Sequence, residues 1–460
     1  MATTTVSIGS NQSIDTETPA TTSGSGPSYT VTFETTPTGI HVGDIGFMNT
    51  EDAGGGNMSD YTFLVTAISG DDITLKYLTD TDSKGDASPV GLYDGTGTSG
   101  APNQAEMVFK RAFSTITLFE AMVDDASPKY WGTTDDVVGE LHADSNFTDA
   151  TVNFSQKQSL SSVTLSVYED DRHDGTAESG ALWKPTANSG HNQGILRINI
   201  DNMTAEWLDI SMDSLDSRNT NKAIVLVGTN DDNIIRNNLL HDKGGNPGST
   251  GPNVIHVIAA GSTSDVLYIQ NNIIYNIVET SGDHAVGINT NQWSGTTHIY
   301  NNTVYNIDSQ GSSKIAYGIV YGSNTNNTTN VKNNLVAKMV ADGGASNERA
   351  FQKSNASSTE NASNNLSDDT TTTATYKAPG TDSLQDKTSA EIDFVSTTAG
   401  SEDLHIDENS VCIGAGVDLG TTNEVNIDID GETMSGDWSI GADWVSAGVT
   451  GNPAFLMFVD

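Results

Sequence analysis

Short apolar runs alternate with clusters of Asn, Asp and Gly through the middle of this 460-residue chain. The apolar runs are rich in Val, Ile, Tyr and Thr, and they show no long stripe at the 3.6-residue spacing of a helix. β-Branched and aromatic residues favour strands, whereas Asn, Asp and Gly favour turns. The pattern therefore predicts an all-β structure from about residue 195 to residue 366.

Pairs of adjacent asparagines divide this region into units of similar length. Successive pairs are 34, 30, 32 and 31 residues apart, and a branched apolar residue lies two positions before each of the first four. The pairs are Asn237-Asn238, Asn271-Asn272, Asn301-Asn302, Asn333-Asn334 and Asn364-Asn365. Self-similarity at a fixed period of about 30 residues is typical of a solenoid. We therefore expect one coil per repeat.

Each repeat contains a second strand-like run, at residues 223–227, 254–260, 285–288 and 316–321. One coil thus contains at least two strands, and we expect three. Equivalent strands of successive coils would form parallel sheets in register. The paired asparagines would lie at a corner, where Asn tolerates the left-handed backbone and can hydrogen-bond the equivalent Asn of the next coil.

This repeat resembles the right-handed parallel β-helix (pectate-lyase-like) superfamily over roughly residues 110 to 446. The segment from Asp403 to Val417 resembles the last coils of β-helix polysaccharide lyases. Relatives often carry an Arg shortly after an Asp-x-x-Gly, and this chain has Thr433-Met434-Ser435 there. The resemblance implies a right-handed parallel β-helix, and strand-like runs between residues 29 and 77 predict a small β-domain before it, so the whole fold is expected to be all-β.

The composition along the chain predicts five regions. A helix is expected at about residues 117–124, where Thr117 and Glu120 have the spacing of a capping box, and it would cover the open end of the solenoid. The regions are a flexible arm (1–26), a small β-domain serving as an attachment module (27–78), a linker (79–108), the β-helix with its capping helix (109–446) and an apolar tail (447–460).

The charge of the chain excludes some partners. Sixty acidic residues against twenty basic ones give a formal charge of −40. Nucleic acids and anionic membranes attract basic surfaces, so neither is an expected partner. The single cysteine, Cys412, lies in an apolar run, which predicts a buried thiol and excludes an intramolecular disulfide.

The N-terminus lacks the basic head and apolar core of a secretory signal peptide, and no apolar run has the length of a membrane span. Together with the resemblance, this favours a structural bacteriophage virion surface protein: a tailspike, fibre or capsid-decorating protein. The expected partners are other virion proteins, two further copies of the chain in a homotrimer, and a cell-surface polysaccharide. The alternatives are a polysaccharide-degrading lyase or glycoside hydrolase, and an adhesin that binds carbohydrate without cleaving it.

Cleavage of a polysaccharide would need paired carboxylates, or a base near calcium-binding acids. Asp242, Glu279 and Asp308 follow successive asparagine pairs at similar positions, so stacked coils could bring them together. The alternative is a solvated rim in an acid-rich chain.

Calcium is the one cofactor that the sequence suggests. The stretch Asn426-x-Asp428-x-Asp430-Gly431 matches the start of a calcium loop, and Asp437 stands at its twelfth position, where Glu is expected. The alternative is a buried strand, because Ile427 and Ile429 alternate with the acids.

Two further features have a functional and a structural interpretation. The stretch from Tyr168 to Thr176 contains His173 and three aspartates, which fit either a metal or catalytic cluster or a turn in which Gly175 has positive φ. Tyr275 and Tyr305 occupy the same position in successive repeats, and they fit either stacking on sugar rings or a buried aromatic ladder.

Overall fold

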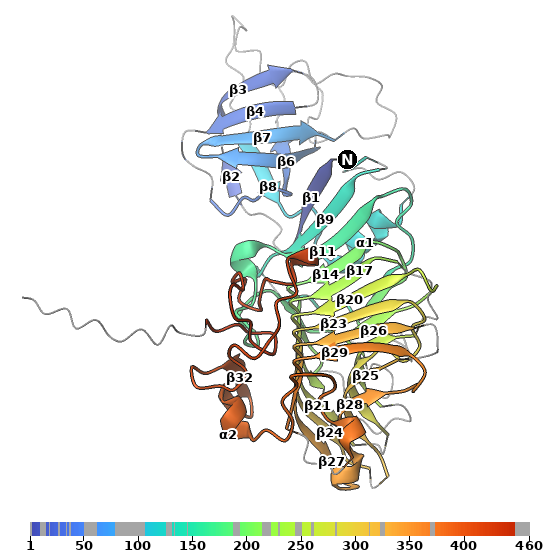
Figure 1. Cartoon of the computed structure of the whole chain (residues 1–460). Coiled ribbons are helices and arrows are strands. Elements are labelled where there is room, and N and C mark those ends of the chain that lie inside the picture. The colour runs from blue at the N-terminus through green and yellow to red at the C-terminus, as the bar shows by residue number, and fades with distance from the viewer. Residues whose placement is uncertain are drawn as a thin grey trace, which may run out of the picture.

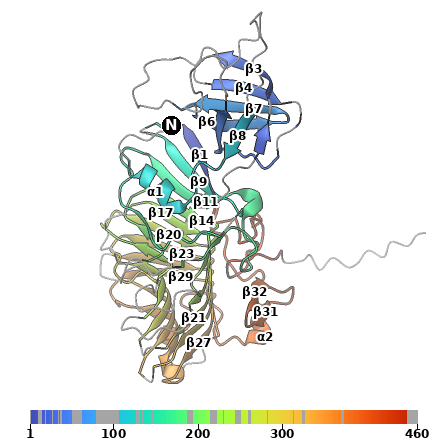
Figure 2. The same ribbon diagram turned by 180° about the vertical axis from the view of Figure 1, so that it is seen from behind.

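A computed structural model defines the fold (Figures 1 and 2). Three parallel sheets form a β-solenoid, and a seven-stranded antiparallel sheet lies at its N-terminal end. The predicted all-β parallel solenoid preceded by a β-domain is therefore confirmed. The structure describes residues 2–9, 15–17, 19–25, 28–33, 35, 38–49, 62–78, 106–125, 131–132, 134–144, 146–186, 194–213, 222–228, 231–243, 251–258, 262–280, 283–311, 313–322, 327–368 and 373–446.

Each full coil contributes one strand to each of three sheets. Sheet 1 contains β1 (Thr3–Ile8), β9 (Asp136–Leu141), β11 (Ser162–Val167), β14 (Met203–Glu206), β17 (Asn233–Arg236), β20 (Val266–Gln270), β23 (Thr296–Tyr300), β26 (Thr328–Lys332) and β29 (Thr359–Ser363). Sheet 2 contains β12 (Leu182–Trp183), β15 (Asp209–Ser211), β18 (Leu239–Lys243), β21 (Ile273–Glu279), β24 (Thr303–Ser309), β27 (Leu335–Ala341) and β30 (Leu366–Ser367). Sheet 3 contains β10 (Val152–Phe154), β13 (Leu196–Ile198), β16 (Ile224–Leu226), β19 (Asn253–Val257), β22 (Ala285–Asn289), β25 (Ala316–Tyr321) and β28 (Glu348–Lys353).

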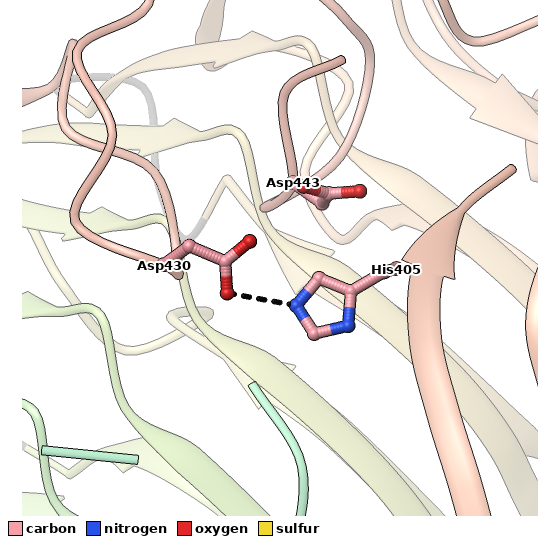
Figure 3. Close-up of side chains that lie close together, drawn as sticks. All are labelled: His405, Asp430 and Asp443. Carbon is pink, nitrogen blue, oxygen red and sulfur yellow. Dashed lines mark hydrogen bonds and ion pairs between the residues drawn. The ribbon is translucent and has the colours of Figure 1, made fainter. Parts of the chain in front are cut away.

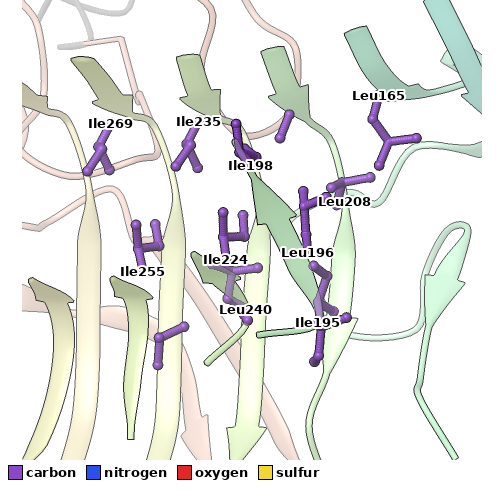
Figure 4. Packing of buried hydrophobic residues seen from close by; sticks show 14 of the residues in the cluster. Leu165, Ile195, Leu196, Ile198, Leu208, Ile224, Ile235, Leu240, Ile255 and Ile269 are labelled. Carbon is purple, nitrogen blue, oxygen red and sulfur yellow. The ribbon is translucent and has the colours of Figure 1, made fainter. Parts of the chain in front are cut away.

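Equivalent apolar side chains stack in columns inside the solenoid (Figure 4). Ile235 pairs with Ile269 and Ile269 with Ile299 along sheet 1, and all three are fully buried. Ile224 and Ile255 form a matching column on sheet 3. Because side chains alternate between the two faces of a strand, this register gives each coil the same inward set.

The asparagine pairs lie between sheets 1 and 2 and form the predicted corner. The first asparagine of each of the five pairs has a φ between 52° and 56°, in the left-handed region. The second asparagines form a fully buried ladder, in which each side-chain amide donates to the next Oδ1 at 2.9–3.0 Å. The same Oδ1 atoms also accept a backbone N–H from the preceding coil, so the ladder satisfies polar groups inside the corner.

The helix α1 (Ile116–Val123) closes the N-terminal end of the solenoid, as expected. It buries Ile116, Phe119 and Val123 in the solenoid core. Its N-cap is Thr115, whose side chain accepts from the N–H of Leu118, so the predicted capping box at residues 117 and 120 is wrong. The helix begins two residues earlier than that box requires.

The N-terminal residues differ from the expected flexible arm. Residues 3–8 form β1, which pairs in parallel with β9 and adds a strand to sheet 1. Val6 and Ile8 alternate along β1 and are fully buried, which is the signal that the sequence interpretation passed over. The antiparallel sheet contains β2 (Asp15–Glu17), β8 (Glu106–Lys110), β5 (Ile45–Asn49), β6 (Thr62–Ser69), β7 (Asp72–Tyr77), β4 (Ser28–Phe33) and β3 (Pro19–Ser25), in that order.

The β-domain therefore takes strands from the expected arm and from the expected linker. Within the β-domain, β6 and β7 form a hairpin around a turn at Gly70. The apolar tail at 447–460 and most of the linker lie outside the described residues. Among the described residues, no helix is both long enough and apolar enough to cross a membrane.

Residues 389–446 form a strap over the outer face of sheet 2, rather than the last coils suggested by the resemblance (Figure 1). The strap begins with α2 (Ser389–Ile392) and the hairpin of β31 (Phe394–Thr398) and β32 (Ser401–Ile406). Its apolar side chains pack on outward residues of sheet 2 in a single cluster, which includes Leu239, Ile273, Leu335, Leu404, Ile429 and the buried Cys412.

The first asparagines of the pairs hold the strap in place. Asn271 and Asn301 donate their side-chain amides to the Val425 carbonyl at 3.2 and 3.0 Å. Asn333 donates to the Val417 carbonyl at 2.8 Å. Each pair thus has a divided role: one asparagine faces the ladder and the other faces the strap.

Candidate functional site

A polar groove of about 540 Å³ lies on the outer face of sheet 3. Its floor comes from the outward positions of β19, β22, β25 and β28, which alternate with the buried column of the core. His256 pairs with Asn289, and Asn289 with Val320, in one row of the floor. Tyr317 pairs with Arg349 in the neighbouring row. The regular coil spacing therefore lays these side chains out along the solenoid axis.

Tyr317 is the aromatic side chain of the groove, and it is half-buried. The guanidinium carbon of Arg349 lies 5.6 Å from the ring centroid of Tyr317 and 4.0 Å from that of Tyr376. The ring of His284 meets Tyr317 edge-on at 5.6 Å. Arg349 also donates to Gln352 Oε1 at 2.8 Å, so the stacked rings and this hydrogen bond hold the guanidinium in place.

The charge of the groove is opposite to that of the chain as a whole. Lys222 and Arg349 line it, and Asp283 is the one carboxylate among its described lining residues. Asp283 in turn faces Lys314 at 3.7 Å. Burial lowers the pKa of Lys222 to about 8, which leaves the ammonium mostly protonated at neutral pH. Burial and the Lys222 charge lower the pKa of His256 to about 3, so His256 is neutral.

Side-chain amides provide the remaining polar surface. Asn289 donates to Asn253 Oδ1 at 2.7 Å, and Asn291 and Gln352 also line the groove. Amides both donate and accept hydrogen bonds, which suits the hydroxyl groups of a sugar. An aromatic ring beside amides and a fixed cation is an arrangement that can bind a sugar carrying a negative group.

The three carboxylates proposed from the sequence as catalytic candidates lie on sheet 2 and do not converge. Asp242 accepts from Asn276 at 3.1 Å, and Asn276 precedes Glu279 by three residues, about 10 Å along a strand. Glu279 is fully buried and pairs with Ser309. Asp308 pairs with Val278, so its side chain and that of Glu279 point to opposite faces.

The proposed calcium ligands differ in their surroundings. Asp428 is fully buried and accepts the N–H groups of Asp430 and Glu432, so it organises its own turn. Burial, with the nearby charges of Asp430 and Asp443, raises the pKa of Asp428 to about 7. Asp437 is exposed, and its carbonyl accepts from the Trp444 indole.

Asp430 meets two residues that the sequence interpretation did not select, His405 and Asp443 (Figure 3). One potential ligand atom from each of the three lies within 4.8 Å of the others. Burial would lower the pKa of His405, but the hydrogen bond and charge of Asp430, with the charge of Asp443, outweigh it and raise the pKa to about 10. No sequence spacing joins these residues, because a strand and two turns of the strap bring them together.

The His173 turn and the tyrosines Tyr275 and Tyr305, for which the sequence allowed a functional or a structural role, have structural surroundings. His173 is buried and its Nε2 lies 3.0 Å from the Asn237 carbonyl, while Gly175 has a φ of 82°. Tyr275 and Tyr305 are buried beneath the strap. The ring exposed to the groove is Tyr317, on a different sheet.

No protein-family model matches this chain, and no curated protein matches it either. The fold and the geometry of the groove therefore carry the functional argument.

Proposed function

We propose that this protein is a virion surface protein of the tailspike, fibre or capsid-decoration type, and that its solenoid binds an anionic surface glycan in the sheet 3 groove. The observation that carries the proposal is the groove itself. It places Tyr317, Arg349 and Lys222 together on a chain with a formal charge of −40. A glycan bearing carboxylates is repelled by most of such a surface and attracted at this groove.

Each lining group has a role in this binding. Tyr317 offers a ring face for a sugar, and Arg349 offers a fixed guanidinium fork for a carboxylate. The side-chain amides of Asn253 and Asn289 can hydrogen-bond the hydroxyl groups of the sugar. Because the same rows repeat from coil to coil, a polymer lying along the solenoid axis would meet successive lining positions.

The residues that line the groove favour binding of the glycan without its cleavage. Hydrolysis of a glycosidic bond usually takes a pair of carboxylates, and Asp283 is the one carboxylate among the described lining residues. Elimination by a base beside a cation remains the rival chemistry. It would produce an unsaturated uronide, which absorbs in the ultraviolet.

The virion part of the proposal rests on fold-level likeness to phage β-helix proteins. In this arrangement the antiparallel sheet attaches to other virion proteins and the solenoid projects. A homotrimer is expected, and light scattering would then give about three times the 48.5 kDa of one chain. Mass spectrometry of particles released from cells that carry the gene should detect this chain, and its absence from such particles would refute the virion setting.

Glycan binding is tested by titrating the full chain with a uronate-rich polysaccharide and with a neutral one. Arg349→Ala and Tyr317→Ala should each weaken binding of the acidic polymer about tenfold or more. Lys332→Ala and Tyr300→Ala, on the outer face of sheet 1, are the matched controls and should bind as the unaltered chain does. Equal binding by all four variants would refute the groove, and ultraviolet absorbance rising with time would replace binding by lyase activity.

A further inference from the structure

The second chemical feature of the molecule lies in the strap, away from the groove. His405 belongs to β32, whereas Asp430 and Asp443 come from two later turns (Figure 3). The Nε2 atom of His405 lies 3.0 Å from Asp430 Oδ1. Asp443 is buried, and its Oδ2 accepts the N–H of Ile406, which fixes the carboxylate beside β32.

We infer that His405, Asp430 and Asp443 form a binding site for a divalent transition-metal ion, with zinc as the representative ion. The three groups supply one imidazole nitrogen and two carboxylate oxygens. Three protein ligands with one open position are a known zinc arrangement. Calcium fits less well, because it takes six to eight oxygen ligands and this cluster includes a nitrogen.

The distances suit such an ion. Ligand atoms about 2.0–2.1 Å from a tetrahedral zinc lie about 3.3 Å from one another. His405 Nε2 and Asp430 Oδ1 are already 3.0 Å apart, so a small opening of this pair admits the ion. Asp430 is partly exposed, which leaves its side chain free to make that movement and gives the ion a route from solvent.

The surroundings of His405 hold the ring in the orientation that a metal requires. Its Nδ1 faces Asp403, within hydrogen-bond distance, and a carboxylate at Nδ1 leaves Nε2 as the ligand atom. The ring also lies against Gly175 of the solenoid. A Cβ on that glycine would lie 2.4 Å from His405 Cε1 and Nε2, so only glycine gives the ring this place.

The site would join three segments of the strap, next to the solenoid. β32 and the two later turns belong to the strap, and Gly175 belongs to the turn that follows β11. An ion at this point therefore ties β32 to the two later turns of the strap, and it fixes the His405 ring that packs against Gly175 of the solenoid. The function expected of the ion is structural, and it does not depend on the glycan groove.

The test uses the full chain, treated with a chelator and then titrated with zinc by calorimetry. We expect one ion per chain, with at least tenfold weaker binding in His405→Gln and in Asp430→Asn. Asp430→Asn changes a partly exposed side chain, so it reports binding even if the variant of the partly buried His405 folds poorly. His298→Gln, a half-buried histidine on sheet 1, is the control and should keep the affinity of the unaltered chain.

Two further readouts separate a specific site from loose ion binding to an acidic protein. Cobalt in place of zinc should give intense visible absorption bands that are lost in His405→Gln, because such bands report a four-coordinate ion and the variant removes one of its ligands. Zinc should also slow protease cleavage of the strap in the unaltered chain and leave cleavage in Asp430→Asn unchanged. Equal zinc affinity in all variants, or no binding at all, would overturn the inference.

Discussion

At the residue scale, the two asparagines of each pair do different work although they are chemically identical. The first adopts the left-handed backbone at the corner, and the second donates inside the ladder. Asn302 lies in the middle of that ladder. It accepts from Asn272 and donates to Asn334, both at 2.9 Å, and no part of it is exposed.

Asn302→Ala should lower the free energy of unfolding by about 2–3 kcal/mol. The change removes two side-chain hydrogen bonds of the ladder and the acceptor of the buried Asn272 backbone N–H, and a buried group left unsatisfied costs about 1–3 kcal/mol. Guanidinium unfolding followed by circular dichroism measures the loss. Asn361→Ala, an exposed asparagine two coils further on, is the control and should change stability by less than about 0.5 kcal/mol. A loss as large in the control would contradict the role of the ladder.

A second residue-scale feature is a buried histidine between two acids on sheet 2. His241 Nε2 lies 2.7 Å from Asp209 Oδ1, and its Nδ1 lies 2.8 Å from Asp242 Oδ2. The ring stacks on Tyr275 at 5.2 Å. Burial alone would lower the pKa of His241, but the hydrogen bonds and charges of the two aspartates outweigh it and raise the pKa to about 9.

Because the folded-state pKa of His241 is raised, its contribution is fully present below pH 6.5 and is lost as pH rises through about 9. We expect the free energy of unfolding to fall over this range by on the order of 3 kcal/mol, since one pKa unit corresponds to about 1.4 kcal/mol. Denaturant unfolding at several pH values measures the slope. His241→Gln should flatten it and His298→Gln should not. The same slope in both variants would count against this assignment.

At the scale of single elements, α1 covers the N-terminal end of the solenoid and the strap covers the outer face of sheet 2. A sheet edge or end left bare invites association with other chains. The helix fills the N-terminal end with Phe119, whose ring makes edge contacts with Phe113, Trp131 and Phe154. The ring fits because Gly139 has no Cβ, which would otherwise lie 2.7 Å from it.

Phe119→Ala should therefore destabilise the fold by about 3–5 kcal/mol, the usual cost of removing a buried aromatic ring. The neighbouring Leu118→Ala is a matched control, because the Leu118 side chain is 50 % exposed on the same helix. Thermal and denaturant unfolding of both variants give the comparison. Similar losses in the two would mean that the ring does not fill the end of the solenoid.

At the scale of the whole molecule, sheet 2 is apolar on both faces. Leu240 and Ile274 face the core, while Leu239 and Ile273 face the strap. Strands of a sheet that is buried on both faces have continuous apolar runs in their sequence, which explains the Leu-Leu and Ile-Ile pairs after the asparagines. The strap is therefore part of the folded unit and not an appendage.

A chain ending at residue 388 should expose this outer face and associate. We expect larger species in light scattering and increased binding of a hydrophobic dye, because exposed apolar patches of this kind drive association. The full-length chain at the same concentration is the comparison. A shortened chain with the mass and dye binding of the full-length chain would show that sheet 2 does not need the strap.

The sequence by itself determined the repeat, the coil, the corner asparagines and the covering helix. Strand periodicity and turn chemistry depend on neighbouring residues only. Because each coil has the same local structure, the same pattern of apolar residues and paired asparagines recurs along the chain. The apolar run around Cys412 is an equally local signal, and the predicted burial of its thiol is confirmed.

The tertiary structure decided what lies side by side. The pairing of β1 with β9, the strap over sheet 2, and the meeting of Asp430 with His405 join residues far apart in the chain. The loops between asparagine pairs differ in length, so sequence position did not fix which acids share a face. A one-residue change of register moves a side chain to the opposite face of a strand, which is why Glu279 and Asp308 separate while Tyr317 and Arg349 meet.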